Sequence, residues 1–252
     1  MAHEIDYKII GDDLQAIEIE LDPQEAVRAE VGAMLFMEDG IQMQTNTSGG
    51  IFQGLKRIVA GENFFITSFL NTGAGKQHVT FAAPFPGKII PLNLRDFGGN
   101  FLCQRDGFLC AAQGIEINVE FTKRIGAGLF GGEGFILQRL SGDGLAFVHA
   151  GGTIIEKNLR ANESLRVDTG CLVAFEPTVD YDIQFIGGFK NVLFGGEGMF
   201  FARLTGPGKV FLQSLPFSRL ADRIINASRW GGRKEESRGL GGLFGSLISG
   251  NE

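Results

Sequence analysis

A close internal repeat constrains this chain more than any other sequence feature. Leu193–Gly208 is a near copy of Leu129–Gly144, and the two segments are offset by 64 residues. A chain that repeats itself at a fixed interval stacks equivalent structural units. The repeat therefore predicts an architecture of similar modules, in each of which a Gly-Gly-Glu-Gly segment leads into an apolar run.

A third, more divergent copy spans Ile58–Gly75, with the same Gly-Glu opening, apolar run and Gly-x-Gly turn. Each copy is followed by a short strand-like segment, so each unit is predicted to be a β-hairpin. The glycines of the turn tolerate the positive φ angles that tight hairpins need. The predicted return strands are Lys76–Ala82, Leu145–Ala150 and Lys209–Leu215.

A second kind of segment also recurs. Leu21–Met37 aligns without a gap on Leu159–Phe175, and Leu94–Ala111 is the middle copy, with Asp106 matched to Thr169. The chain thus divides into three modules, roughly 8–85, 86–150 and 151–216. Each module is too small and too edge-exposed to be stable alone. We expect one compact β domain over residues 1–216, with the modules around a pseudo-threefold axis.

Composition agrees with this fold class and excludes several functions. The 38 glycines indicate many turns, and the 23 phenylalanines indicate a dry interior. A net charge of −6 argues against a nucleic-acid partner. The apolar runs are shorter than the roughly 20 residues that span a bilayer.

The cysteines indicate a reducing compartment. Cys103, Cys110 and Cys171 have apolar neighbours and form no CxxC or Cys/His cluster, so we expect buried thiols. The first residues lack the basic and apolar regions of a secretory signal. A cytoplasmic location is the expectation.

Residues 217–252 depart from the repeat. Ser218 is a candidate cap for a short helix with Leu220, Ile224 and Ala227 on one face. A polar linker follows, and then the glycine-rich tail 239–252 carries Leu, Phe and Ile. That tail is either flexible or a docking segment for a protein partner or a lipid surface.

Three segments carry a family resemblance. Gly54–Phe65, Pro84–Ile90 and the doubled Gly-Gly-Glu-Gly resemble the altered-inheritance-of-mitochondria family, over about residues 8–216. The resemblance implies short double-stranded β-helix units, similar to the fold of the tryptophan RNA-binding attenuation protein. Subunits of that protein close into rings, so a trimer of a three-unit chain would approximate a nine-unit ring.

The resemblance also bears on function. The mitochondrial relatives are associated with inner-membrane organisation, and no catalytic residue is established for the family, so none is assigned here. The first 20 residues are acidic, and Lys8 is the only Lys or Arg among them. This lack of a presequence favours a bacterial or archaeal cytoplasmic member.

Glu62, Glu133 and Glu197 occupy equivalent places in the three hairpins. Three carboxylates near a pseudo-threefold axis would suit a hard cation or a basic ligand. The favoured interpretation is structural. Arg139 and Arg203 lie six residues after two of these glutamates, about 20 Å along a strand, so they would pair with glutamates of neighbouring modules.

Other candidate sites are weaker. His78 and His149 fall in corresponding return strands, but the third return strand has no histidine, and His3 lies apart. Gly126–Gly131 matches Gly-x-Gly-x-x-Gly, yet it lies between strands rather than before a helix, so it fails as a dinucleotide site. The sequence therefore assigns no catalytic residue, no metal ligand and no cofactor.

The function expected from the sequence is that of a non-enzymatic, homo-oligomeric scaffold or interaction module, with a trimer favoured. The alternative is a small-ligand-binding protein that uses clefts between modules, and an enzyme of unknown type is third. The repeat, the lack of a catalytic constellation and the apolar tail motivate this order.

Overall fold

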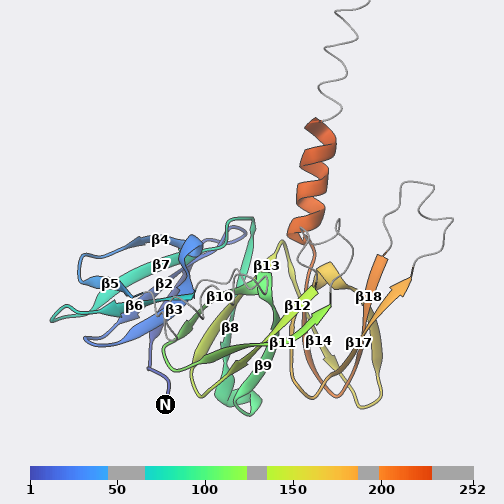
Figure 1. The fold of residues 1–252 in the computed structure, drawn as a ribbon, viewed down its shortest axis with the longest axis horizontal. Coiled ribbons are helices and arrows are strands. Elements are labelled where there is room, and N and C mark those ends of the chain that lie inside the picture. Colours follow the sequence, from blue (N-terminus) through green and yellow to red (C-terminus); the bar gives the residue numbers. More distant parts are fainter. Residues whose placement is uncertain (45–65, 124–134, 187–198, 229–252) are drawn as a thin grey trace, which may run out of the picture. The chain divides into compact units, whose positions relative to one another are not determined.

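The computed structural model describes residues 1–44, 66–123, 135–186 and 199–228. The chain divides into two compact units, Met1–Pro216 and Phe217–Glu252. The described part of the first unit consists of β-strands and short 3-10 turns, arranged in four antiparallel sheets (Figure 1). The expected all-β class is confirmed in this general form.

The first third of unit 1 holds seven of the described strands and one 3-10 turn. Their bounds are β1 (Asp6–Ile10), β2 (Ala16–Leu21), β3 (Ala26–Glu30), η1 (Val31–Ala33), β4 (Met34–Met37), β5 (Ile41–Gln44), β6 (Ile66–Asn71) and β7 (Gln77–Ala82). β7 pairs with β2 and β4, whereas β6 pairs with β3 and β5. β1 covers the outer edge of β2.

The middle third has the corresponding elements without an equivalent of β1. They are β8 (Gly87–Asn93), η2 (Leu94–Phe97), β9 (Asn100–Gln104), η3 (Arg105–Gly107), β10 (Phe108–Ala112), β11 (Glu116–Lys123), β12 (Phe135–Ser141) and β13 (Leu145–Gly151). β13 pairs with β8 and β10, and β12 pairs with β9 and β11.

The last third ends unit 1. Its elements are β14 (Ile154–Leu159), β15 (Ser164–Asp168), η4 (Thr169–Cys171), β16 (Leu172–Phe175), β17 (Asp180–Ile186), β18 (Met199–Thr205) and β19 (Gly208–Gln213). β19 pairs with β14 and β16, and β18 pairs with β15 and β17.

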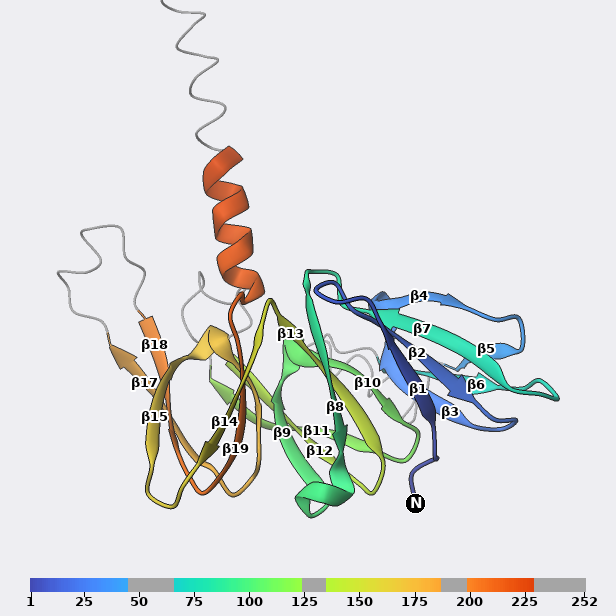
Figure 2. The same cartoon turned by 180° about the vertical axis from the view of Figure 1, so that it is seen from behind.

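Two further strand pairs join the thirds to one another. β3 pairs with β10, and β9 pairs with β16. Each of these pairs merges two three-stranded sheets into one six-stranded sheet, with the orders β5-β6-β3-β10-β13-β8 and β11-β12-β9-β16-β19-β14. The remaining sheets, β1-β2-β7-β4 and β15-β18-β17, end at β4 and β15 (Figure 2).

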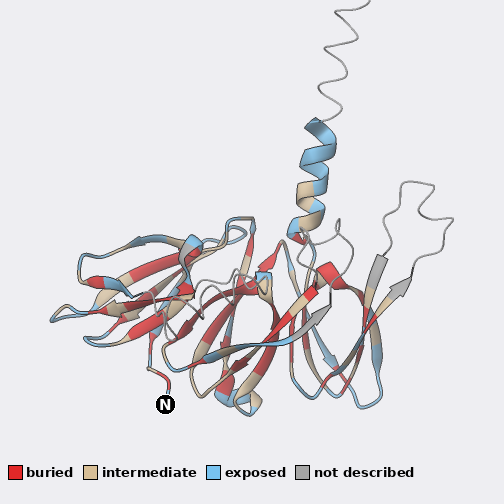
Figure 3. Ribbon diagram, viewed as in Figure 1, coloured by how far each residue is buried: buried red, intermediate tan, exposed pale blue. Residues whose placement is uncertain are grey.

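The core follows from the alternation of apolar and polar residues along the strands. In β2, Ile17, Ile19 and Leu21 are fully buried and the residues between them are not. Buried stretches run along the strands of unit 1 (Figure 3). Phenylalanines supply the largest buried side chains, as the composition predicted. Phe69 and Phe81, for example, meet edge to face with ring centroids 5.1 Å apart.

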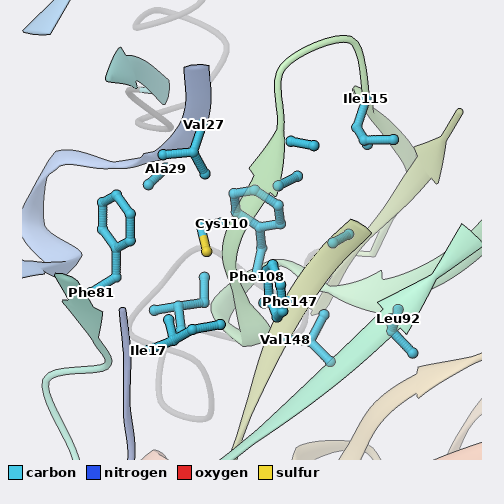
Figure 4. Packing of buried hydrophobic residues seen from close by; sticks show 14 of the residues in the cluster. Ile17, Val27, Ala29, Phe81, Leu92, Phe108, Cys110, Ile115, Phe147 and Val148 are labelled. Carbon is cyan, nitrogen blue, oxygen red and sulfur yellow. The ribbon is translucent and has the colours of Figure 1, made fainter. Parts of the chain in front are cut away.

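The core is continuous across the pair β3–β10. Ile17 and Phe81 of the first third belong to the same buried cluster as Cys110, Phe147 and Val148 of the middle third (Figure 4). The two thirds therefore share apolar packing as well as backbone hydrogen bonds.

Most of the predicted strands are confirmed, and one predicted match between modules is wrong. The predicted return strands correspond to β7, β13 and β19. The match of Asp106 with Thr169 is off by one residue, because η3 begins at Arg105 and η4 begins at Thr169. Both turns therefore obey the 64-residue offset of the hairpins.

The helix of the second unit covers residues 217–228. It begins before Ser218, so that residue lies in the first turn and is not the N-cap. Phe217, Ile224 and Ile225 are exposed. No helix in the described ranges is long and apolar enough to cross a membrane.

Candidate functional site

Arg139 has its partner in its own hairpin. From β12, its Nε and Nη2 donate to the two carboxylate oxygens of Glu120 on β11, at 3.0 and 2.8 Å. The guanidinium holds the pKa of Glu120 below its ordinary value. Glu120 occupies a β-bulge between Val119 and Phe121. These two hydrogen bonds between Arg139 and Glu120 hold the two strands of the hairpin together.

Arg203 lies on β18 between two charged neighbours. Its backbone is opposite Arg166 of β15 on one side and Asp182 of β17 on the other. All three residues are exposed. β15 is an edge strand, so this face of the last sheet presents two arginines close to an open edge.

The predicted glutamate triad cannot be placed. Glu62, Glu133 and Glu197 lie outside the described residues, as do Gly126–Gly131 and the tail 239–252. Their role as contacts between modules stays a prediction.

The three histidines lie apart and have different roles. His3 accepts a hydrogen bond at Nδ1 from the Ala26 backbone N–H, at 2.9 Å. His149 is buried, which lowers its pKa to about 4, and its ring meets Phe85 edge to face. His149 is therefore neutral at physiological pH.

His78 lies on β7 between two carboxylates. Its ring nitrogens are 3.3 Å from Glu38 and from Glu20. Partial burial acts to lower the pKa of His78, but Glu38 and Glu20 outweigh it and raise the pKa. Among the described residues there is no group of three or more His, Cys, Asp or Glu side chains arranged to hold a metal ion.

The cysteine prediction is confirmed for two of the three residues. Cys103 and Cys110 are fully buried, and burial raises the pKa of the Cys103 thiol to about 12. The pKa of Cys110 is raised for the same reason. Cys171 is only partly buried. Thiols this hard to ionise are poor nucleophiles, so neither buried cysteine is a catalytic candidate.

The outer edge of β4 has no partner strand among the described residues and carries exposed apolar side chains. Leu35 and Phe36 are 57% and 56% exposed on this strand. An unpaired strand edge with exposed apolar side chains is a template for pairing with another strand. Sequence reasoning missed it, although the apolar run Met34–Met37 was a usable signal.

The comparisons with known proteins find one family and bacterial relatives. The sequence profile described as mitochondrial biogenesis AIM24 matches residues 7–215. An uncharacterized protein of Streptococcus pyogenes serotype M6 is 28% identical over 216 residues, which cover 82% of this chain and 84% of that protein.

A solved structure supports the fold. The X-ray crystal structure of a Streptococcus pyogenes protein from a structural genomics consortium superimposes with a TM-score of 0.74 at 23% identity. The match covers 89% of this chain and all of the other. The profile match over residues 7–215 confirms the family resemblance seen in the sequence, and the chain belongs to the mitochondrial biogenesis AIM24 family.

Proposed function

We propose that unit 1 is three copies of one module and that the protein is a self-assembling scaffold or interaction module without catalytic activity. The recurring strand pairs support the modular interpretation. So do Gln24, Gly98 and Asn162, which have φ angles of 70°, 65° and 65° at offsets of 74 and 64 residues.

A backbone hydrogen bond recurs at the corresponding place in each module. The N–H groups of Asn71, Gly142 and Gly206 donate to the carbonyls of Glu25, Gly99 and Glu163, in that order, each at 2.9 Å. A shared turn conformation and a shared hydrogen bond at corresponding positions are what a repeated module produces. They support the kinship with the ring-forming double-stranded β-helix fold.

The observation that carries the scaffold proposal is a pair of complementary strand edges that lack a partner among the described strands. Successive modules join in the same way at both junctions. The strand equivalent to β3 in one module pairs with the strand equivalent to β10 in the next, as β3–β10 and again as β9–β16. Among the described strands, β4 of the first module, which is equivalent to β10, and β15 of the last module, which is equivalent to β3, lack such a partner. A chain with complementary open ends associates head to tail and closes into a ring if the rotation permits.

We propose a ring of three copies, which the analogy with a nine-unit ring favours. The reduced, buried Cys103 and Cys110 support a cytoplasmic location.

Size-exclusion chromatography with light scattering tests this function. We expect one species with three times the chain mass of 27.2 kDa at micromolar concentration. A monomer at that concentration would refute the proposal. Native mass spectrometry of the same sample adds the alternative: a stoichiometric bound small molecule would instead favour a ligand-binding protein.

A further inference from the structure

We infer that β15 of one copy pairs antiparallel with β4 of a second copy in one defined register, in which Val167 lies opposite Phe36 and Arg166 lies opposite Met37. The inference rests on the proposed self-assembly and specifies its interface. β4 and β15 belong to different sheets and are not partners of each other within the described chain.

The register follows from the two junctions inside the chain. Ala29 lies opposite Cys110 in the first junction, and Cys103 lies opposite Ala174 in the second. Val167 occupies on β15 the position that Ala29 occupies on β3 and Cys103 occupies on β9. This equivalence follows from the register, because β15 pairs with β18 as β3 pairs with β6.

The same comparison locates Phe36. Register shifts occur between Met34 and Phe36, between Phe108 and Cys110, and between Leu172 and Ala174. Phe36 therefore corresponds to Cys110 and Ala174, and Val167 of the partner strand falls opposite it.

Burial supports the interface. Cys110 and Ala174, which are the residues equivalent to Phe36, are fully buried at their junctions. Leu109 and Val173, which are the residues equivalent to Leu35, are 2% and 1% exposed. At β4 the corresponding side chains are more than half exposed, which is what an interface without its partner strand would show.

A polar contact at the first junction predicts which groups meet at the interface between copies. At the first junction, Arg28 on β3 donates from Nη1 to the Ile115 carbonyl at 2.8 Å. Arg166 occupies the place of Arg28 on β15, and Ile41 occupies the place of Ile115 after β4. Arg166 of one copy would therefore donate to the Ile41 carbonyl of the next.

A second polar contact at the first junction corresponds to an ion pair at the interface between copies. Ser68 donates to the Gln113 side chain across the first junction at 3.1 Å. Arg203 corresponds to Ser68, because each lies opposite the equivalent arginine. Asp39 corresponds to Gln113. A hydroxyl–amide contact inside the chain would become an Arg203–Asp39 pair between copies, so the charges match between two copies of this chain.

Disulfide cross-linking tests the register. The Gln113 N–H donates to the Ala26 carbonyl, so Ala29 and Cys110 form a pair that lies between the hydrogen-bonded pairs, where Cα atoms approach most closely. Cysteine already occupies the positions equivalent to Phe36 and Val167 at the inner junctions, so both substitutions fit the site.

A mixture of Phe36→Cys and Val167→Cys chains should give covalent dimers that contain one chain of each kind. The double variant should give closed covalent trimers. The matched control is Leu35→Cys with Val167→Cys, which is out of register by one residue and should cross-link at least ~10-fold less efficiently.

Three results would overturn the inference. They are Phe36→Cys chains that link only to one another, a double variant that links within one chain, and an intact oligomer that does not cross-link in the proposed register. The last leaves the proposed function standing, whereas a monomer under all conditions removes the function itself.

Charge reversal gives a second readout. Asp39→Arg alone should weaken association by about 10-fold, and combining it with Arg203→Asp should restore association to within about 3-fold of the unmodified chain. A double variant no tighter than the single variants would contradict the Arg203–Asp39 pair.

Discussion

Phe36 is the side chain whose loss should weaken the assembly most. A phenylalanine side chain offers on the order of 200 Å² of surface. Since Phe36 is 56% exposed, pairing with β15 of a second copy would bury about 110 Å² of it. At about 25 cal/mol per Å², this burial is worth about 3 kcal/mol for each interface.

Phe36→Ser should therefore raise the dissociation constant of each chain–chain interface by about 100-fold, because 1.4 kcal/mol corresponds to a factor of ten. Sedimentation velocity over a dilution series measures this constant. Circular dichroism should show an unchanged strand content, since the side chain is exposed in the isolated chain.

The matched control is Ile155→Ser. Ile155 is 41% exposed on β14, an edge strand that has no counterpart in the proposed interface. It should leave the dissociation constant unchanged. If Phe36→Ser changes the constant by less than about threefold, or if both variants weaken assembly equally, the reasoning about β4 is wrong.

Three further predictions concern stability. Because the folded pKa of His149 is lowered to about 4 from 6.5, stability should be complete above pH 6.5 and fall by about 2–3 kcal/mol as the pH drops toward 4; urea unfolding of His149→Leu should lose this acid dependence. The lowered pKa of Glu120 means that its contribution is present above pH 4.5 and lost as the pH falls through the folded value, so Glu120→Gln should cost less than about 1 kcal/mol at pH 7 and nothing in strong acid. A Cβ on Gly87 would lie 2.1 Å from the Ala150 carbonyl oxygen, whereas one on Gly75 would meet nothing within 4 Å; thermal unfolding should show Gly87→Ala strongly destabilised and Gly75→Ala close to the unmodified chain.

Local sequence patterns predicted the individual strands well. Ile17, Ile19 and Leu21 alternate with polar residues, and β2 follows that alternation. Such a pattern depends only on which side chains face the core, so it can be seen in a short window of sequence. The hairpins were predictable for the same reason, since both strands and the turn are close in sequence.

The joins between modules were not predictable in this way. Ala29 and Cys110 pair across a long stretch of chain, and nothing local in either strand specifies the other. The partner of Arg139 was missed for a different reason. Glu120 reaches it from a β-bulge, and a bulge disturbs the period-two pattern from which side-chain direction is predicted.

Hydrogen exchange followed by mass spectrometry tests the head-to-tail pairing most directly. The backbone amides of β4 and β15 should be protected at high protein concentration and exchange rapidly when the protein is diluted below its dissociation constant. The edge strand β14, which has no part in the proposed interface, should show the same exchange at both concentrations. Protection at β4 and β15 that does not change with concentration, or a change confined to other edges, would contradict the pairing.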